Sequence, residues 1–139
     1  MEKINHSSYS YVILDDDLAS VELLTQQLMQ LPQMRLISQF TNPIDATHAF
    51  NSYETVDFLF LDIGMEVSGI DVARMLKNKA KFIVFVTGYS EFALEAFEYG
   101  DAYLVKPVDL KTLKRAILYL LDKSAKQVFE NQQNLVDER

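Results

Sequence analysis

Cysteine is absent from the 139-residue chain. Its absence excludes disulfide bonds, thiolate catalysis and thiolate zinc sites, and fits a reducing compartment. Glycine and proline are few, with four and three residues, which argues against a loop-rich or low-complexity protein. We therefore expect regular elements joined by short connections.

Long apolar runs are also missing. The longest, such as Phe82–Val86, have the length of a strand and fall far short of the about 20 residues that a membrane helix needs. Residues 1–8 carry Lys3 but no apolar stretch after it, so they do not form a secretory signal. We expect a cytoplasmic protein without membrane contact and a disordered segment over residues 1–8.

Basic residues are outnumbered by acidic ones. Lys and Arg total 13 and Asp and Glu total 20, giving a formal net charge of −7. A protein that binds a phosphate backbone needs clustered positive charge. Direct nucleic-acid binding by this segment is therefore not expected.

What is present is an alternation of apolar runs and helical patterns in a chain long enough for one core. Five short apolar runs occur, at Tyr9–Leu14, Arg35–Phe40, Phe58–Leu61, Phe82–Val86 and Ala102–Val105. Alternation of this kind predicts an α/β domain with a five-stranded parallel sheet, here over residues 9–123. The mixed polarity of Arg35–Phe40 suggests a strand at the edge of the sheet.

The segments between the runs have helical spacing. A first helix is expected after the cap Asp17 and before Pro32, and its apolar stripe is Leu18, Val21, Leu24, Leu28 and Leu31. A second begins at Asn42 and Pro43 and runs to about Ser52, because Asn caps helices and Pro suits a first turn. A short third helix follows Gly69.

Two further helices complete the pattern. The fourth is expected over Phe92–Phe97, capped by Ser90 and ended by Gly100 in the left-handed conformation. The fifth begins at Asp109, and its apolar stripe is Leu110, Leu113, Ile117, Leu120 and Leu121. A polar segment over residues 124–139 continues it as a helical extension or linker.

Polar residues close four of the five runs. Asp15 and Asp16 follow the first, Asp62 the third and Lys106 the fifth, while Thr87 follows Val86 of the fourth. Ligands of open parallel sheets bind outside the carboxyl ends of the strands, so these side chains are predicted to converge. Asp17 is interpreted as a helix cap only.

Electrostatics suggests what this convergence binds. Two carboxylates about 4 Å apart repel by about 4 kcal/mol at an effective dielectric constant of 20, so a cation is needed among them. Oxygen ligands without His or Cys suit Mg²⁺. A carboxylate beside a divalent cation and the ammonium of Lys106 is also a competent nucleophile toward phosphorus. Taken singly, Thr87 is more often a turn residue, Lys106 a solvated side chain and Tyr103 ordinary packing.

At these positions the chain resembles the response-regulator receiver domain over about residues 10–122. The matching segments are Leu14–Asp17, Phe60–Met65, Val86–Tyr89 and Tyr103–Pro107. The segment Glu91–Gly100 is similar to receivers that carry a LytTR-type DNA-binding domain. The resemblance implies a flavodoxin-like (CheY-like) (βα)5 fold, doubly wound, with strand order 2-1-3-4-5.

The resemblance also implies a set of roles. Asp62 would be the phosphoacceptor, and Asp15, Asp16, Asp62 and the backbone carbonyl of Gly64 would bind Mg²⁺. Thr87 would hydrogen-bond the phosphoryl group and Tyr103 would be the aromatic switch. Lys106 would pair with the phosphate, before a cis peptide bond to Pro107.

The implied partners follow from the same resemblance. A sensor histidine kinase would donate the phosphoryl group, and a homodimer would form through the fourth and fifth helices. A LytTR-type DNA-binding domain beyond residue 139 would make the chain part of a transcriptional regulator.

One departure from the family pattern keeps alternatives open. Receivers usually have a proline after the methionine that follows the acceptor and a glycine eight positions beyond the acceptor, whereas Glu66 follows Met65 and Gly69 comes after seven. A receiver-like interaction module that accepts no phosphate is therefore a second hypothesis. A phosphatase with an aspartyl intermediate is a third, but Gly64 stands where such enzymes place a general acid, so the chain is not expected to be an enzyme.

Overall fold

The computed structural model describes residues 8–137, with side chains up to residue 125. Residues up to Val108 form one compact unit and residues from Asp109 onward form a second. The disorder expected over residues 1–8 falls, except for Ser8, outside the described residues. None of the described helices is long and apolar enough to cross a membrane.

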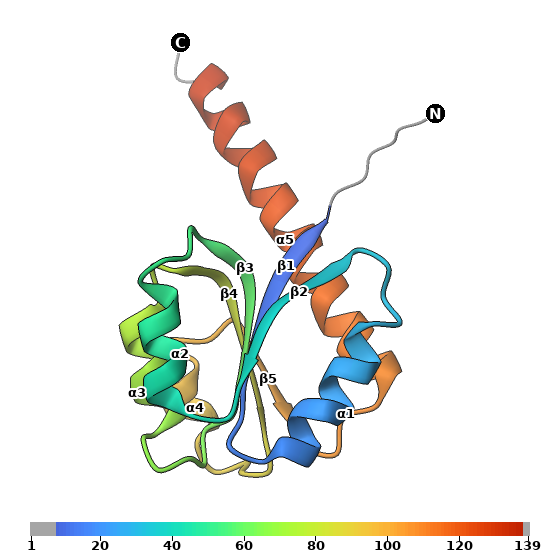
Figure 1. The fold of residues 1–139 in the computed structure, drawn as a ribbon. Helices are drawn as coiled ribbons and strands as arrows, with labels where there is room; N and C mark the ends of the chain where they lie inside the picture. Colours follow the sequence, from blue (N-terminus) through green and yellow to red (C-terminus); the bar gives the residue numbers. More distant parts are fainter. Residues whose placement is uncertain (1–7, 138–139) are drawn as a thin grey trace. The chain divides into compact units, whose positions relative to one another are not determined.

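The first unit is built on a five-stranded sheet (Figure 1). Its strands are β1 (Tyr9–Leu14), β2 (Met34–Phe40), β3 (Val56–Leu61), β4 (Ala80–Thr87) and β5 (Ala102–Val105). All neighbouring strands are parallel, and their order is β2-β1-β3-β4-β5. The predicted fold class and strand order are confirmed, and β2 lies at an edge as its mixed polarity suggested.

The helices follow the strands in the predicted alternation. They are α1 (Leu18–Leu28), α2 (Pro43–Phe50), α3 (Gly69–Leu76), α4 (Ala93–Ala96) and α5 (Leu110–Asp137). Two predicted caps are confirmed: the Asp17 side chain accepts from Ala19 N, and the Asn42 side chain accepts from Ile44 N, with Pro43 in the first turn of α2. Local capping chemistry thus fixes where α1 and α2 begin.

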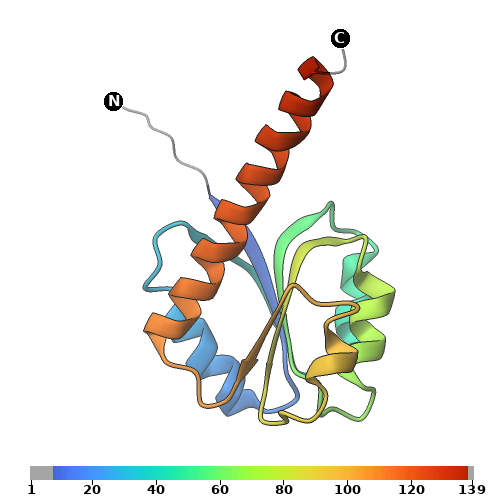
Figure 2. The same ribbon diagram turned by 180° about the vertical axis from the view of Figure 1, so that it is seen from behind.

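Successive side chains of a strand point to opposite faces of the sheet. In the first unit, side chains on both faces are buried. Val12 and Leu14 of β1 pack in one core with residues of α2, α3 and α4. Tyr11 and Ile13 are equally buried on the other face. Figures 1 and 2 show α1 on the side of the sheet opposite α2, α3 and α4.

Aromatic rings fill much of the face that Tyr11 belongs to. Tyr11 meets the Phe60 ring edge to face at 6.0 Å, and Phe58 lies 5.8 Å from Phe60 and 5.0 Å from Phe82. Such pairs add about 0.5–1.5 kcal/mol each beyond the area they bury. The central strands are thereby fixed relative to one another, together with the residues that end them.

The first helix differs from its prediction at both ends. It stops at Leu28, so Leu31 lies beyond it. Leu18 has an exposed fraction of 58%, whereas Val21, Leu24 and Leu28 are buried. The predicted stripe is therefore too long. The first helical residue directly follows the loop that leaves β1, so only the later turns pack on the sheet.

The fourth helix is shorter than predicted, and both of its predicted ends are wrong. The position before the helix is Phe92, with no side-chain cap bond, so Ser90 does not cap it. Gly100 does not have a positive φ. It is instead a point of close approach, because a Cβ there would lie 2.5 Å from Cε2 of Phe85.

The second unit consists of α5. Thr112 N donates to Asp109 Oδ1 at 2.7 Å, which caps the helix at the predicted residue. Leu113, Ile117 and Leu120 are buried, whereas Leu110 and Leu121 are only half-buried. The buried stripe of α5 is therefore narrower than predicted. The backbone remains helical to Asp137.

Candidate functional site

The carboxyl ends of four strands bring the predicted site residues together. Leu14 of β1 pairs with Leu61 of β3, and Leu61 with Phe85 of β4. Asp15 and Asp62 directly follow β1 and β3, so the register places them side by side. Thr87 is the last residue of β4 and Lys106 directly follows β5.

Three carboxylates form a cluster at this edge of the sheet. Asp15, Asp16 and Asp62 each offer an oxygen, and these atoms all lie within 4.8 Å of one another. Asp15 and Asp62 are 5% and 7% exposed, whereas Asp16 is exposed. A cluster of oxygen donors without His or Cys suits a hard cation, because carboxylate oxygens are the ligands such ions prefer.

Asp15 has both oxygens engaged. Its Oδ1 accepts from Asp17 N at 2.9 Å and its Oδ2 accepts from Lys106 Nζ at 2.6 Å. Burial raises the pKa of Asp15 above its ordinary value, and the hydrogen bonds from Lys106 and Asp17 oppose this rise. The ionised carboxylate is therefore costly in the folded protein, and a bound cation would offset that cost.

Asp62 is held by one oxygen, and its other oxygen makes no hydrogen bond to the described residues. Ile63 N donates to Asp62 Oδ1 at 2.8 Å. Asp62 Oδ2 lies 3.7 Å from Lys106 Nζ, close enough for an ion pair and too far for a hydrogen bond. The carboxylate is thus oriented, while Oδ2 keeps lone pairs for a metal ion or an electrophile.

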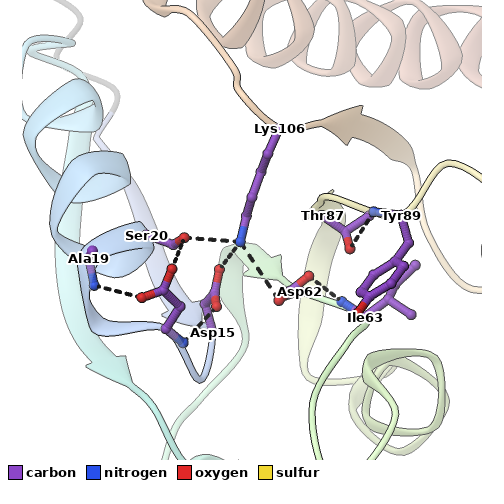
Figure 3. A network of polar contacts seen from close by, with 9 residues as sticks. Asp15, Ala19, Ser20, Asp62, Ile63, Thr87, Tyr89 and Lys106 are labelled. Atoms are coloured by element: carbon purple, nitrogen blue, oxygen red, sulfur yellow. Dashed lines mark hydrogen bonds and ion pairs between the residues drawn. The ribbon is translucent and has the colours of Figure 1, made fainter.

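Lys106 spans the site. Its side chain crosses from the end of β5 and places Nζ among Asp15, Ser20 and Asp62 (Figure 3). The peptide bond between Lys106 and Pro107 is cis, as the family resemblance implied. An ammonium beside a carboxylate cluster partly offsets its negative charge.

Thr87 and Tyr103 connect the site to the loop after β4. Thr87 is fully buried, and its Oγ1 accepts from Tyr89 N at 3.4 Å, a long bond. The Tyr103 hydroxyl donates to the Tyr89 carbonyl, and its ring lies 6.1 Å from Phe85. Burial raises the pKa of Tyr103, so this hydroxyl remains a donor at neutral pH.

Gly64 lies in the loop after β3, under the ring of Tyr89. A Cβ at Gly64 would lie 2.2 Å from Cε2 of Tyr89, so the ring rests against the glycine backbone. Gly64 is exposed. Glu66 is exposed too, and among the described residues it does not belong to the carboxylate cluster.

The shortened loop closes through Gly69. Gly69 N donates to Ile63 O at 3.0 Å, and Ser68 caps α3 by accepting from Ile70 N. A Cβ at Gly69 would lie 1.8 Å from the carbonyl oxygen of Asp62. Only glycine lets the start of α3 come this close to the backbone of Asp62.

Comparisons with known proteins identify the family of the chain. The model of the response regulator receiver domain matches residues 11–118. The chain belongs to this family. As a receiver domain it takes part in two-component signal transduction.

Curated relatives agree with this assignment. An uncharacterized response regulatory protein of Vibrio cholerae is 36% identical over 115 residues, which are 81% of this chain and 48% of that protein. The transcriptional regulatory protein BtsR of Escherichia coli (strain K12) is 32% identical over 131 residues, 89% of this chain and 54% of that protein. The chain thus spans about half the length of these relatives.

Solved structures show the same fold. The response regulatory domain of mrkE from Klebsiella pneumoniae is 26% identical, with a TM-score of 0.75 over 84% of this chain and 98% of that chain. TrrA from Thermotoga maritima, solved in complex with Mg²⁺–BeF, is 27% identical, with a TM-score of 0.69 over 81% of this chain and 98% of that chain.

Two residues of the site could not be identified from the sequence. Ser20 accepts from Lys106 Nζ at 3.1 Å, but a serine in a first helical turn signals nothing by itself. Tyr89 covers Gly64 with its ring and bonds Tyr103 through its carbonyl. Its position two residues after Thr87 was the available signal, and it does not reveal the contact with the loop after β3.

Proposed function

We propose that the chain accepts a phosphoryl group on Asp62 from a sensor histidine kinase, in a reaction that requires Mg²⁺, and thereby switches an output. The observation that supports this most is the position of Asp62 Oδ2. That oxygen makes no hydrogen bond within the described residues and lies 3.7 Å from Lys106 Nζ, and Asp62 itself belongs to the carboxylate cluster. A nucleophilic carboxylate toward phosphorus needs this combination of freedom and adjacent positive charge.

In this proposal Asp15, Asp16, Asp62 and the carbonyl of Gly64 hold Mg²⁺. The ion would supply positive charge to the phosphoryl oxygens. Asp62 Oδ2 forms the new O–P bond while the N–P bond to the donor histidine breaks. Lys106 Nζ and the Thr87 hydroxyl then donate to phosphoryl oxygens.

The proposed switch runs from Thr87 to Tyr103. When the Thr87 hydroxyl turns to the phosphoryl group, Tyr89 N loses its acceptor, and the Tyr89 carbonyl is the acceptor that holds the Tyr103 hydroxyl. Moving such an equilibrium from 1:99 to 99:1 takes about 5.5 kcal/mol. A phosphoryl dianion that gains bonds from Lys106 and Thr87 supplies a large part of it.

Intact mass spectrometry after incubation with acetyl phosphate tests the proposal. We expect one phosphoryl adduct that requires Mg²⁺ and is absent from Asp62→Asn. Asp71→Asn is the matched control, because Asp71 is exposed and pairs with Arg74 on α3. An adduct that persists in Asp62→Asn would contradict the assignment of the acceptor.

A phosphorylation-independent receiver module is the second candidate, and the shortened loop favours it. The loop lacks the family's proline, and the contact between Gly69 and Asp62 leaves it little freedom to adjust. This candidate predicts Mg²⁺ binding without an adduct. Turnover as an enzyme has no such support, since Gly64 offers no general acid.

The output of the longer protein is also a proposal. The relative BtsR is a transcriptional regulatory protein of about twice the aligned length. We infer that residues 124–139 link a cytoplasmic receiver domain, residues 9–123, to a LytTR-type DNA-binding domain. The fourth and fifth helices are the proposed homodimer contact. Sedimentation of the full-length protein with and without phosphorylation tests the dimer, and DNA binding by the same two samples tests the output.

A further inference from the structure

Ser20 lies in the first turn of α1 and contacts the site through its hydroxyl oxygen. Its Oγ is 3.1 Å from Lys106 Nζ and 2.9 Å from Asp17 Oδ2. Neither the family pattern quoted above nor the predicted roles give Ser20 a part in the chemistry. It is half-buried, and Figure 3 shows it facing the Lys106 ammonium.

The direction of both hydrogen bonds follows from the partners. An ammonium can only donate, so Ser20 Oγ accepts from Lys106, and an ionised carboxylate can only accept, so the Ser20 hydroxyl donates to Asp17. Asp17 is itself fixed, because its other oxygen accepts from Ala19 N at 3.2 Å as the cap of α1. The hydrogen bond to Asp17 thus orients the Ser20 hydroxyl so that its lone pairs face Lys106.

The ammonium is consequently held at two points. One N–H donates to Asp15 Oδ2 at 2.6 Å and a second to Ser20 Oγ at 3.1 Å. The distance of 3.7 Å to Asp62 Oδ2 leaves the third N–H without a hydrogen bond to the acceptor. That gap is on the side where a group carried by Asp62 would extend.

We propose that Ser20 is a positioning residue that anchors the Lys106 ammonium, so that its third N–H is free for a phosphoryl oxygen on Asp62. The anchoring is a property of the unmodified protein. Its consequence for phosphorylation rests on the proposed function of Asp62.

A purely structural role makes different predictions. If Ser20 served only α1, through its bond to Asp17, then Ser20→Ala would lower stability and leave Lys106 and phosphorylation kinetics unchanged. The matched variant is Ser20→Thr, which keeps the hydroxyl and its two bonds.

The anchor can be measured without phosphorylation. Nuclear magnetic resonance of the Lys106 ammonium reports the exchange of its N–H protons with water. Because a hydrogen bond to a charged group is lost, we expect exchange about five times faster or more in Ser20→Ala and near the original rate in Ser20→Thr. An unchanged exchange rate in Ser20→Ala overturns the proposal, whether or not the protein is phosphorylated.

The kinetic consequence is measured with acetyl phosphate and Mg²⁺. We expect the phosphorylation rate of Ser20→Ala to fall about tenfold, the low end for a bond to a charged group, because water reaches this half-buried site. In a Lys106→Ala background the same substitution should change the rate less than twofold. An equal fall in both backgrounds would show that Ser20 does not act through Lys106, and would overturn the proposal.

The phosphorylation of Asp62 and the anchoring of Lys106 by Ser20 can be refuted independently of each other. If the unsubstituted chain forms no adduct, phosphorylation of Asp62 is refuted, while the ammonium measurement still decides whether Ser20 holds Lys106.

Discussion

Replacing Gly69 by alanine tests the account of the shortened loop. The added Cβ would lie 1.8 Å from the carbonyl oxygen of Asp62, 2.7 Å from its carbonyl carbon and 2.8 Å from Cα of Ile63. All three are backbone atoms, so no side-chain rotation relieves the overlap. The start of α3 or the end of β3 has to move by more than about 1 Å to restore ordinary contact distances.

The expected loss of stability is about 3 kcal/mol. Overpacking in a well-packed region costs about 1–3 kcal/mol and occasionally more. Losing the bond from Gly69 N to Ile63 O costs about 1 kcal/mol further. The lower chain entropy of unfolded alanine returns about 0.4–1 kcal/mol. For a chain of this size the sum corresponds to a fall in Tm of about 10 °C.

Gly88→Ala is the matched control, because a Cβ there would meet no described residue within 4 Å other than its chain neighbours, and Gly88 does not have a positive φ. We expect it to leave the free energy of unfolding unchanged or to raise it by up to about 1 kcal/mol. Both variants are compared by urea denaturation, with the Mg²⁺ affinity measured alongside. A movement of the end of β3 displaces Asp62, so we expect the Mg²⁺ affinity of Gly69→Ala to fall as well.

The reasoning is refuted if Gly69→Ala unfolds within about 0.5 kcal/mol of the unsubstituted chain, the range of an ordinary surface substitution. The loop would then be able to accommodate the added methyl group. The shortening of the loop would not force α3 into close contact with the backbone of Asp62. Loss of stability without loss of Mg²⁺ affinity would place the strain in α3 alone.

Three further predictions concern other parts of the chain. Tyr103→Phe removes the bond to the Tyr89 carbonyl and should lower the free energy of unfolding by about 0.5–1 kcal/mol, measured by urea denaturation; no change would show that water replaces the hydroxyl fully. The pKa of Asp109 is lowered by the hydrogen bonds from Thr112 N and the Thr112 hydroxyl, so its folded pKa lies below its unfolded one. The stabilisation by its charge is therefore present above about pH 4 and lost as the pH falls through the folded value. The Tm difference between the unsubstituted chain and Asp109→Asn should accordingly shrink below about pH 4, and a constant difference would exclude the charge as its cause. Gly64→Ala should displace the half-exposed Tyr89 ring and change stability by less than about 1 kcal/mol, visible as shifted Tyr89 resonances; unshifted resonances would show that the loop moves instead.

The sheet was predictable because its signals are local. Apolar runs bounded by polar residues predict buried parallel strands, and the residue that ends each run is placed by the strand itself. Asp15, Asp62 and Thr87 converge for this reason alone. Lys106 converges too, but its reach to Asp15 depends on a side chain that crosses the site from β5, and spacing alone does not reveal that path.

The C-terminal end of α4 was not predictable, because a glycine can end a helix in the left-handed conformation or can permit a close contact. Gly100 matched a left-handed helix end, but its actual constraint is the Phe85 ring at the position of its missing Cβ. That contact joins β4 to the segment after α4 and exists only in the folded chain. Leu18 was misjudged for a similar reason, since spacing places a residue on a stripe and does not reveal where the sheet ends.

Ser20 and Tyr89 show why part of the site stayed hidden. Ser20 lies three residues after Asp17, and this spacing indicates only local capping. The contact that matters joins Ser20 to Lys106, which is 86 positions away in the chain. Tyr89 likewise meets Gly64 from a different loop. Residues that a strand end presents directly can be inferred from a sequence, whereas residues that orient them across the fold require the structure.

The loop after β3 is one residue shorter than the family pattern, and the structure shows how this shorter loop closes. One residue fewer separates Asp62 from the glycine of α3, and the loop is closed by Gly69 N on Ile63 O and by the Ser68 cap. The backbone of Asp62 is thereby held from both sides, since Asp62 N also donates to Leu14 O at 3.0 Å. A shorter loop therefore need not loosen the acceptor. The same loop also meets the loop after β4 at Gly64, where the three atoms nearest to an added Cβ all belong to the ring of Tyr89.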